Sequence, residues 1–452
     1  MEIKDLYQIY LQSAGLNTDT RTIREGQLFL ALKGENFDGN SFALQALEAG
    51  AAYAVVNETV EADDPRLIKV PDTLAALQQL AAFHRQQFDI PVIGLTGTNG
   101  KTTTKELIKA VLSAKYCVTA TEGNLNNDIG VPLSVLRINA DTQIAIIEMG
   151  ASHPDDLKPL LAVSQPTHGL ITNVGKAHLL GFGSFEGVKY AKGQLYDYLK
   201  AHEGIAFANA DDPVLQEMLW ERGLPMIPYG MEGAALLPTS ADQPFLQLRL
   251  ADGHLLETHL VGAYNANNVL AALKIGWFFG VPEEAALAAV SAYTPSNNRS
   301  QLMKTARNTV IVDAYNANPS SMAVALDNLA HCTGRKVALL GDMRELGADS
   351  AVEHKKIVDR LIRSFVAVAP QDDNRHSVSS CHSDSSCHSE RSEESVLLVG
   401  EEFTRAAAGT GIRCFASSDD LAAYLQENPL QGCTVLVKGS RGIRMEKVIA
   451  SL

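Results

Sequence analysis

The sequence lacks any apolar run of the roughly 20 residues that a membrane-spanning helix needs. Its first residues, Met1-Glu-Ile-Lys-Asp, also lack the basic and then apolar layout of a signal peptide. We therefore expect a cytoplasmic protein without membrane insertion. The sequence is short of basic residues too, since 38 Lys and Arg stand against 52 Asp and Glu, for a net charge of −14. A surface this acidic repels phosphate backbones, which argues against nucleic acid as a partner.

Cysteine is sparse, and apolar side chains are nearly absent from one internal segment. The six cysteines are scattered without any C-x-x-C spacing, so we expect free thiols in a reducing compartment. Residues 371–394 are almost entirely polar and rich in Ser, which predicts a disordered, protease-sensitive insert. Cys-His pairs begin at Cys381 and Cys387 and leave a metal site as an alternative, although the flanks offer no core to hold one. A translated repetitive element that the fold tolerates is our default interpretation.

Strands and helices alternate along the rest of the 452 residues. A length of roughly 150 residues per domain suggests about three domains. Short, continuously apolar runs such as Gln143-Ile-Ala-Ile-Ile are typical of strands buried on both faces of a parallel sheet. We predict an α/β protein with a small domain at 1–85, a central doubly wound domain at 86–295 and a Rossmann-like domain at 296–452.

A loop that holds phosphates is the strongest chemical signal. The apolar run from Val92 to Leu95 leads into Gly97-Thr-Asn-Gly-Lys-Thr, and a helix is expected from about Lys101. Glycines let backbone amides turn toward phosphate oxygens, the helix start adds partial positive charge, and the Thr102 hydroxyl can join a Mg²⁺ shell. The strict G-x-x-x-x-G-K-T pattern asks for Gly at 95, where this chain has Leu. The motif predicts a nucleotide without specifying the reaction.

Polar residues follow two further predicted strands. Glu148 ends one apolar run and His178 follows another, where the carboxyl ends of parallel strands gather ligands. A carboxylate there can hold Mg²⁺. His178 taken alone is more often a structural histidine, and beside the phosphate loop and Glu148 the two interpretations are about equal. Two Asn-rich loops begin at Gly123 and Gly262. Asn favours turns and caps but also suits sugar, peptide and adenine groups, so both interpretations stay open.

Together these residues resemble the Mur ligase family, over nearly the whole chain except 371–394. The matching motifs occur in order: Thr18-Asp-Thr-Arg, Ala31-Leu-Lys-Gly-Glu-Asn-Phe-Asp-Gly, Gly97-Thr-Asn-Gly-Lys-Thr, Gly123-Asn-Leu-Asn-Asn-Asp-Ile-Gly-Val-Pro, Glu148-Met-Gly-Ala, Asn173-Val-Gly-Lys-Ala-His, Ala191-Lys-Gly-Gln, Gly262-Ala-Tyr-Asn-Ala-Asn-Asn, Asp313-Ala-Tyr-Asn-Ala-Asn-Pro, Leu340-Gly-Asp-Met-Arg-Glu-Leu-Gly and Lys438-Gly-Ser-Arg-Gly. The glycine-rich loop with Leu95 is the form that this family uses.

The resemblance implies an ATP-dependent amide ligase that adds D-alanyl-D-alanine to UDP-N-acetylmuramoyl-tripeptide through an acyl phosphate, and we expect a monomer. It implies two Mg²⁺ ions, with Lys101, His178 and Lys192 as catalytic residues. Lys192 would carry a carbamate that bridges a metal, although a surface lysine in a helix is the simpler interpretation of that residue. The implied metal ligands are Thr102, Glu148, His178 and Lys192.

The resemblance also assigns the binding residues. The implied ATP-binding residues are Gly97, Thr98, Asn99, Gly100, Lys101, Thr102, Thr103, Asn268, Arg299 and Asp313. The implied UDP-substrate residues are Thr18, Asp19, Thr20, Arg21, Asn124, Asn126 and Asn127. An Arg beside amide donors is a plausible diphosphate clamp.

Two rival functions remain. A relative one step earlier adds meso-diaminopimelate or lysine, but its Asp-Asn-Pro-Arg-like motif has no counterpart in this sequence. A non-catalytic nucleotide-binding regulator would have no use for Glu148, His178 and Lys192 together.

Overall fold

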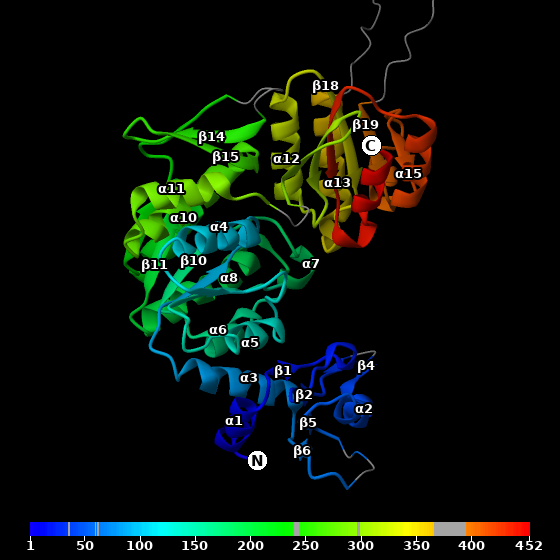
Figure 1. Ribbon diagram of the computed structural model, residues 1–452. Helices are drawn as coiled ribbons and strands as arrows, with labels where there is room; N and C mark the ends of the chain where they lie inside the picture. The colour runs from blue at the N-terminus through cyan, green and yellow to red at the C-terminus, as the bar shows by residue number, and fades with distance from the viewer. Residues whose placement is uncertain (35–36, 59, 61–62, 239–243, 296–298, 366–394) are drawn as a thin grey trace, which may run out of the picture. The chain divides into compact units, whose positions relative to one another are not determined.

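The computed structural model describes residues 1–452 apart from 35–36, 59, 61–62, 239–243, 296–298 and 366–394 (Figure 1). The predicted insert at 371–394, with both Cys-His pairs, lies outside the described residues. The described chain forms two compact units. The first comprises Met1–Gly175, Ser184–Glu232 and Asn267–Val290, and the second comprises Lys176–Gly183, Gly233–Ala266 and Ser291–Leu452.

The first unit begins with a small parallel sheet of order β1-β2-β5-β6. Its strands are β1 (Leu16–Asn17), β2 (Leu28–Leu30), β5 (Tyr53–Val56) and β6 (Leu67–Lys69), beside the hairpin of β3 (Lys33–Gly34) and β4 (Phe37–Asp38). The helices are α1 (Ile3–Gln12), α2 (Ala43–Glu48) and α3 (Thr73–Arg85). The Asp72 side chain accepts a hydrogen bond from Ala75 N and caps α3, the helix that ends this region.

A six-stranded, all-parallel sheet of order β12-β11-β10-β7-β9-β8 forms the centre of the first unit. The strands are β7 (Val92–Thr96), β8 (Val118–Ala120), β9 (Ile144–Glu148), β10 (His168–Ile171), β11 (Ile205–Asn209) and β12 (Met226–Tyr229). Every residue of β7 and β9 is buried, as their continuously apolar sequences predict.

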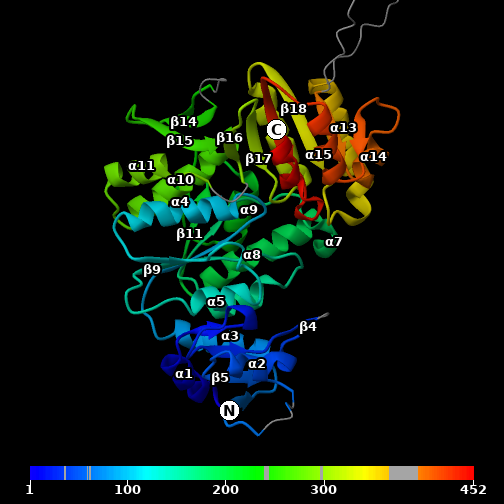
Figure 2. The ribbon, with the colours of Figure 1, turned by 45° about the vertical axis from the view of Figure 1, so that its right-hand side comes forward.

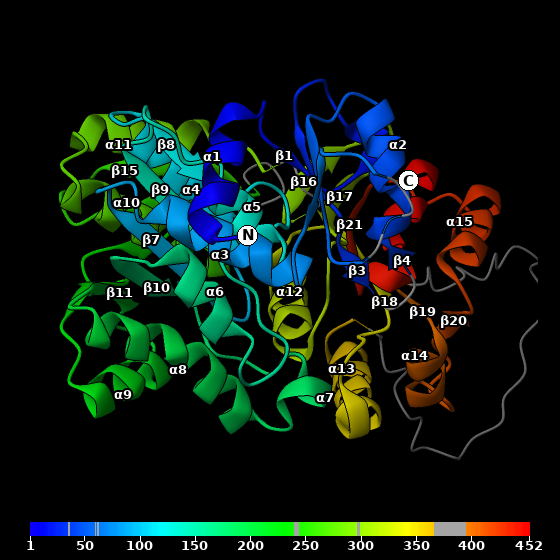
Figure 3. The same ribbon diagram turned by 90° about the horizontal axis from the view of Figure 1, so that it is seen from below.

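Helices cover both faces of this sheet (Figure 2). The helices are α4 (Lys101–Ser113), α5 (Gly130–Val135), α6 (Leu157–Ser164), α8 (Phe185–Ala201), α9 (Pro213–Arg222), α10 (Ala266–Phe278) and α11 (Glu283–Ala292). Gly276 lets α10 approach Val111 of α4, because an added Cβ there would lie 2.3 Å from Val111 Cγ1. On the other face α5, α6 and α8 pack together, and α3 runs beside α5 and α6 (Figure 3). The doubly wound prediction is confirmed.

The second unit holds another six-stranded sheet, of order β16-β17-β21-β18-β19-β20. β16 (Gln301–Lys304) is antiparallel to β17 (Thr309–Asp313), and the remaining pairs are parallel. The other strands are β18 (Arg335–Gly341), β19 (Val396–Val399), β20 (Arg413–Phe415) and β21 (Cys433–Lys438). The helices are α7 (Leu179–Phe182), α12 (Pro319–His331), α13 (Ser350–Ser364), α14 (Glu401–Ala406) and α15 (Ser418–Glu427).

The second unit also contains a three-stranded antiparallel sheet that we did not predict. It consists of β13 (Ala235–Leu236), β14 (Phe245–Arg249) and β15 (Leu255–Val261). Short 3₁₀ turns complete the chain at Thr20–Thr22, Gly39–Phe42, Ala263–Asn265, Gly347–Asp349, Arg441–Ile443 and Met445–Ser451.

The compact units follow packing and do not coincide with the predicted domain boundaries at 85/86 and 295/296, which stay predictions. Residues 1–85 cluster with the central sheet because α3 packs on α5 and α6. Cys117, Cys332, Cys414 and Cys433 are free thiols, as expected. None of the helices among the described residues has the length and apolarity to cross a bilayer.

Candidate active site

The loop between β7 and α4 has a backbone that requires glycine at two positions. Gly97 has φ +145° and Gly100 has φ +78°. An added Cβ at Gly97 would lie 2.0 Å from Thr172 Oγ1, and one at Gly100 would lie 2.9 Å from Asn268 Oδ1. Both conformation and space therefore exclude larger residues. The predicted adenine-side residue, Asn268, thus lies against the phosphate loop within the first unit.

Residues that follow β10 brace this loop. Thr98 N donates to Asn173 O over 3.0 Å, and Asn99 N donates to Asn173 Oδ1 over 3.0 Å. Asn173 Nδ2 and Thr172 Oγ1 both donate to Asn99 O, over 3.0 and 2.7 Å. Gly175 N donates to Thr98 Oγ1 over 2.9 Å. Two amides that we expected to face phosphates are therefore bonded to Asn173, a bracing role that sequence reasoning missed.

The side chain of Lys101 folds back onto the glycine-rich loop. Lys101 Nζ donates to Gly97 O over 2.6 Å and to Thr98 O over 3.0 Å. Thr102 and Thr103 follow in the first turn of α4, and both side chains are buried. An ammonium group held here lies where a phosphate in the loop would meet it.

Glu148 contacts side chains from two other segments, helix α4 and the loop that precedes α5. Its Oε1 accepts from Thr102 Oγ1 over 3.1 Å and from Asn126 Nδ2 over 3.0 Å. Its Oε2 is buried, accepts no hydrogen bond within the described chain, and lies 3.6 Å from Lys105 Nζ. The structure thus brings together Thr102, Glu148 and Asn126, which the sequence proposed separately. Lys105 was missed.

The same arrangement fits one Mg²⁺ ion. A buried carboxylate oxygen without a hydrogen bond, beside a threonine hydroxyl, is the donor set that this hard cation prefers. Within the described part of the chain, no three His, Cys, Asp or Glu side chains gather into a metal-binding group. A cation at Glu148 would therefore take its other ligands from phosphates and water, as Mg²⁺ usually does.

Lys192 is buried, so its interpretation as a surface lysine was wrong. It lies on α8 with its side chain 2% exposed, and its Nζ donates to Ala151 O over 3.3 Å. Burial lowers the pKa of Lys192 well below the usual lysine value, and the charge of Lys101 lowers it further, while Asp156 opposes the shift. Burial therefore favours the uncharged form of this amine.

His178 belongs to the second compact unit and Glu148 to the first. His178 has φ +51°, precedes α7, and places Nδ1 2.5 Å from Glu345 Oε2. This close contact with His178 lowers the pKa of Glu345, against the effect of burial, although Nδ1 lacks the alignment of a hydrogen bond. The described contacts thus join His178 to Glu345, a partner that the sequence did not reveal.

The predicted diphosphate clamp is paired internally. Arg21 Nη2 lies 2.6 Å from Asp19 Oδ2, and Arg21 N donates to Asp19 Oδ1 over 3.0 Å. These hydrogen bonds lower the pKa of Asp19 to about 2. The arginine side chain is exposed. Thr18 and Thr20 flank Asp19 in the same loop, and both are half-buried.

The asparagines of the first Asn-rich loop differ in their roles, since one lies at the candidate site and another forms a turn. Asn126 bonds to Glu148. Asn127 Oδ1 instead accepts from Gly130 N over 2.9 Å at the start of α5, which is a turn and capping role. Asn124 is exposed, and its carbonyl accepts from Asn126 N over 2.8 Å.

Residues at the carboxyl ends of β17 and β21 form a third group. Lys438 Nζ lies 2.5 Å from Asp313 Oδ2, and Ser300 N donates to Asp313 Oδ1 over 3.3 Å. The Arg299 guanidinium lies over the Tyr315 ring, 3.7 Å from its centroid. The structure therefore holds Asp313 and Arg299 through Lys438 and Tyr315, neither of which we had selected.

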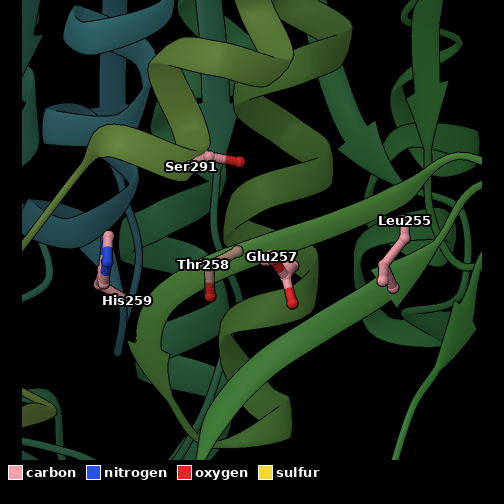
Figure 4. Close-up of a pocket in the computed structure, with 5 residues that line it drawn as sticks. All are labelled: Leu255, Glu257, Thr258, His259 and Ser291. Carbon is pink, nitrogen blue, oxygen red and sulfur yellow. The ribbon is translucent and has the colours of Figure 1, made fainter.

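A hollow of about 280 Å³ lies elsewhere in the second unit (Figure 4). Its labelled side chains point in different directions and do not converge on one centre. None of the predicted site residues lines it; it is lined by Leu255, Glu257, Thr258, His259 and Ser291.

Comparisons with known proteins cover most of the chain. Three family models match: "Mur ligase family, catalytic domain" at residues 13–85, "Mur ligase middle domain" at 95–276 and "Mur ligase, glutamate ligase domain" at 298–441. A UDP-N-acetylmuramoyl-tripeptide–D-alanyl-D-alanine ligase of Bacillus subtilis is 32% identical over 97% of this chain and 93% of its own length.

Solved structures agree with the family models. MurF from Acinetobacter baumannii superimposes with a TM-score of 0.82 at 29% identity, covering 100% of this chain and 98% of that one. MurF ligase from Thermotoga maritima in complex with ADP gives 0.81 at 25% identity, covering 98% and 97%. With three domain models matched in order and a full-length relative above 30% identity, the chain belongs to the Mur ligase family.

Proposed function

We propose that this Mur ligase uses ATP to join D-alanyl-D-alanine to UDP-N-acetylmuramoyl-tripeptide, the step that completes the pentapeptide of the peptidoglycan precursor. The observation that carries the proposal is the full-length similarity to ligases of that name, at 32% identity. The glycine-rich loop with Lys101, Thr102 and Glu148 at its mouth supplies the chemistry that such a ligase needs. The UDP-linked substrate is a soluble metabolite, so we infer a cytoplasmic enzyme, and we expect it to act as a monomer.

The reaction proceeds by carboxylate activation. A terminal carboxylate oxygen of the tripeptide attacks the γ-phosphorus of ATP, the bond to the β-phosphate breaks, and ADP leaves. The amine of the dipeptide then attacks the acyl carbon, releases phosphate with the former carboxylate oxygen, and loses a proton. Phosphoryl transfer depends mainly on positioning and on charge neutralisation. Lys101 and the loop amides at the start of α4 contribute both.

Glu148 and Thr102 are the residues that would hold the first Mg²⁺, and His178 and a carbamate on Lys192 would serve the second. When bound, such ions neutralise phosphate charge and orient the reacting oxygens. The neutral amine of Lys192 would add to CO₂ and release one proton, forming a carbamate. Burial of Lys192 favours the uncharged amine that this addition requires. The carbamate turns a cationic side chain into an anion.

The remaining predicted residues bind the substrates in this proposal. Asn268 contacts the adenine side, Arg299 a phosphate, and Asp313 the ribose. The UDP end of the sugar peptide lies with the Thr18–Arg21 loop, where Arg21 exchanges its bond to Asp19 for the diphosphate. The Asn-rich loop of Asn124, Asn126 and Asn127 contacts the peptide or sugar. These assignments stay predictions.

The test is phosphate release from ATP by the purified protein with Mg²⁺ and UDP-muramoyl-tripeptide. We expect release when D-alanyl-D-alanine is present and none without it. Release with a single diamino acid on the UDP-muramoyl-dipeptide would instead assign the chain to the earlier step of the pathway. Absence of release with every combination would favour the non-catalytic regulator.

A further inference from the structure

The chain passes from the first compact unit to the second directly after the residues that brace the phosphate loop. Asn173 and Gly175 bond to that loop. From the next residue onward, the segment 176–183 belongs to the second compact unit. Lys176 Nζ lies 3.3 Å from Glu353 Oε1, whose carboxylate is 9% exposed. The segment that carries His178 is therefore fixed by residues of the C-terminal region.

His178 and Glu345 form the centre of this attachment. Six described non-glycine residues have positive φ, and two of them, His178 at +51° and Glu345 at +66°, contact each other. Their side chains meet at Nδ1 and Oε2 over 2.5 Å, and Leu180 N donates to the Glu345 carbonyl over 3.2 Å. Left-handed backbone in non-glycine residues costs energy and concentrates at functional sites. Two such residues held together by side chain and backbone indicate a built arrangement.

The surroundings restrict the imidazole further. The Phe182 ring lies edge-on to His178, with centroids 6.3 Å apart. Gly347 has φ +57°, and the Leu180 side chain lies so close that an added Cβ would be 3.0 Å from Leu180 Cδ1. The Glu345 carboxylate, the Phe182 ring and the contact of Leu180 with Gly347 thus all restrict one short helix, α7, and the histidine before it.

We propose that Glu345 is the positioning residue of His178. Its carboxylate, 2.5 Å from Nδ1, favours a proton on that nitrogen and leaves Nε2 as the ring nitrogen that meets a ligand. A carboxylate behind a ligating histidine commonly fixes both the tautomer and the ring orientation. The inference rests on the proposed function, in which His178 serves the nucleotide and metal site.

The experiment compares Glu345→Ala and Glu345→Gln with Glu427→Ala, a matched control at an exposed glutamate of α15. The full chain is labelled with ¹⁵N-histidine, and His178 is assigned among the 12 histidines by His178→Gln. We expect the Nδ1–H tautomer at His178 in the parent and in Glu427→Ala. Glu345→Ala should show a mixture of tautomers, and the Leu180 amide should still be protected from exchange, since its acceptor is a backbone carbonyl.

Function is measured on the same variants. Mg²⁺ binding in the presence of a non-hydrolysable ATP analogue should weaken roughly 10- to 100-fold in Glu345→Ala. Glu345→Gln retains an acceptor without charge and should recover part of the loss. The kcat should fall while KM for the dipeptide changes little. An unchanged His178 tautomer, or Mg²⁺ binding equal to the control, would overturn the proposal. Inactivity of the parent chain would overturn the proposed function alone, because the tautomer readout does not need turnover.

Discussion

Lys105 Nζ lies 3.6 Å from Glu148 Oε2, and the two side chains are 2% and 1% exposed. Lys105 is one helical turn beyond Lys101 on α4, directly behind the phosphate loop. Moving two charges out of water is costly, and the Coulomb attraction offsets the cost only when the pair is intact. The pair therefore places a positive charge against the Glu148 carboxylate inside the buried site.

Removing one partner of this pair should destabilise the first unit strongly. Lys105→Met leaves Glu148 as an uncompensated buried charge, and we expect a loss of about 3–5 kcal/mol in the free energy of unfolding. Urea unfolding can be followed by the two tryptophans, Trp220 and Trp277, which both lie in the first unit. The double variant with Glu148→Gln should recover most of the loss, whereas Lys109→Met, at an exposed position of α4, should change little. If Lys105→Met and Lys109→Met had equal free energies of unfolding, the claim that the buried ion pair stabilises the first unit would be contradicted.

Gly97→Ala should abolish nucleotide binding without unfolding the protein. The added methyl group would meet Thr172 Oγ1 at 2.0 Å, so the loop must shift. A displacement of about 1 Å near the reacting groups can cost roughly 100-fold in activity. Gly223→Ala is the matched control, since Gly223 also has positive φ, +57°, but nothing lies within 4 Å of its Cβ position. ATP affinity measured by calorimetry should fall in Gly97→Ala and not in Gly223→Ala. An equal fall in both variants would show that backbone strain, and not the contact with Thr172, causes the loss.

Lys192→Ala should lose most activity and recover part of it when short carboxylic acids are added, because they replace the carbamate anion. Lys200→Ala, at an exposed position of the same helix, should keep full activity and show no response to the acids. Turnover with and without added bicarbonate provides the second readout. Full activity of Lys192→Ala would show that the carbamate assignment is wrong.

The stability of the first unit should depend on His168 between about pH 4 and 6.5. Burial lowers the pKa of His168 from 6.5 to about 4. In this window the unfolded chain binds the proton and the folded chain does not, so stability falls as the pH falls. At about 1.4 kcal/mol per pH unit, the loss is at most about 3.5 kcal/mol.

The comparison variant is His168→Phe, which keeps an aromatic ring beside Phe207, Phe278 and Phe279. Its urea midpoint, followed by tryptophan fluorescence, should change less than that of the parent across the same window. His202→Ala alters an exposed histidine and should leave the parent's pH dependence intact. Parallel curves for parent and His168→Phe would show that His168 titrates normally.

The sequence predicted local features well where one segment carries the whole signal. A continuously apolar strand, a glycine-rich loop and a following helix are adjacent in the chain, so β7, Gly97–Gly100 and α4 could be placed together. The β13–β15 sheet was missed although Leu255–Val261 alternates buried and exposed residues, the pattern of a half-buried strand.

Pairings between distant segments could not be predicted in the same way. A helical lysine such as Lys105 is usually solvated, and its burial becomes apparent only when Glu148 is placed opposite. His178 and Glu345 likewise come from separate motifs, with no spacing rule to join them. Lys192 is the converse case. The family resemblance gave it a role, whereas its local sequence suggested a surface residue.

The most direct test of the central claim uses UDP-muramoyl-tripeptide labelled with ¹⁸O in its terminal carboxylate. Incubation with ATP, Mg²⁺ and D-alanyl-D-alanine should yield one ADP and one phosphate per pentapeptide formed, and each phosphate should carry one ¹⁸O atom. That transfer requires the carboxylate oxygen to bond to the γ-phosphorus. Phosphate without ¹⁸O, or ATP hydrolysis that proceeds equally without the dipeptide, would contradict the assignment.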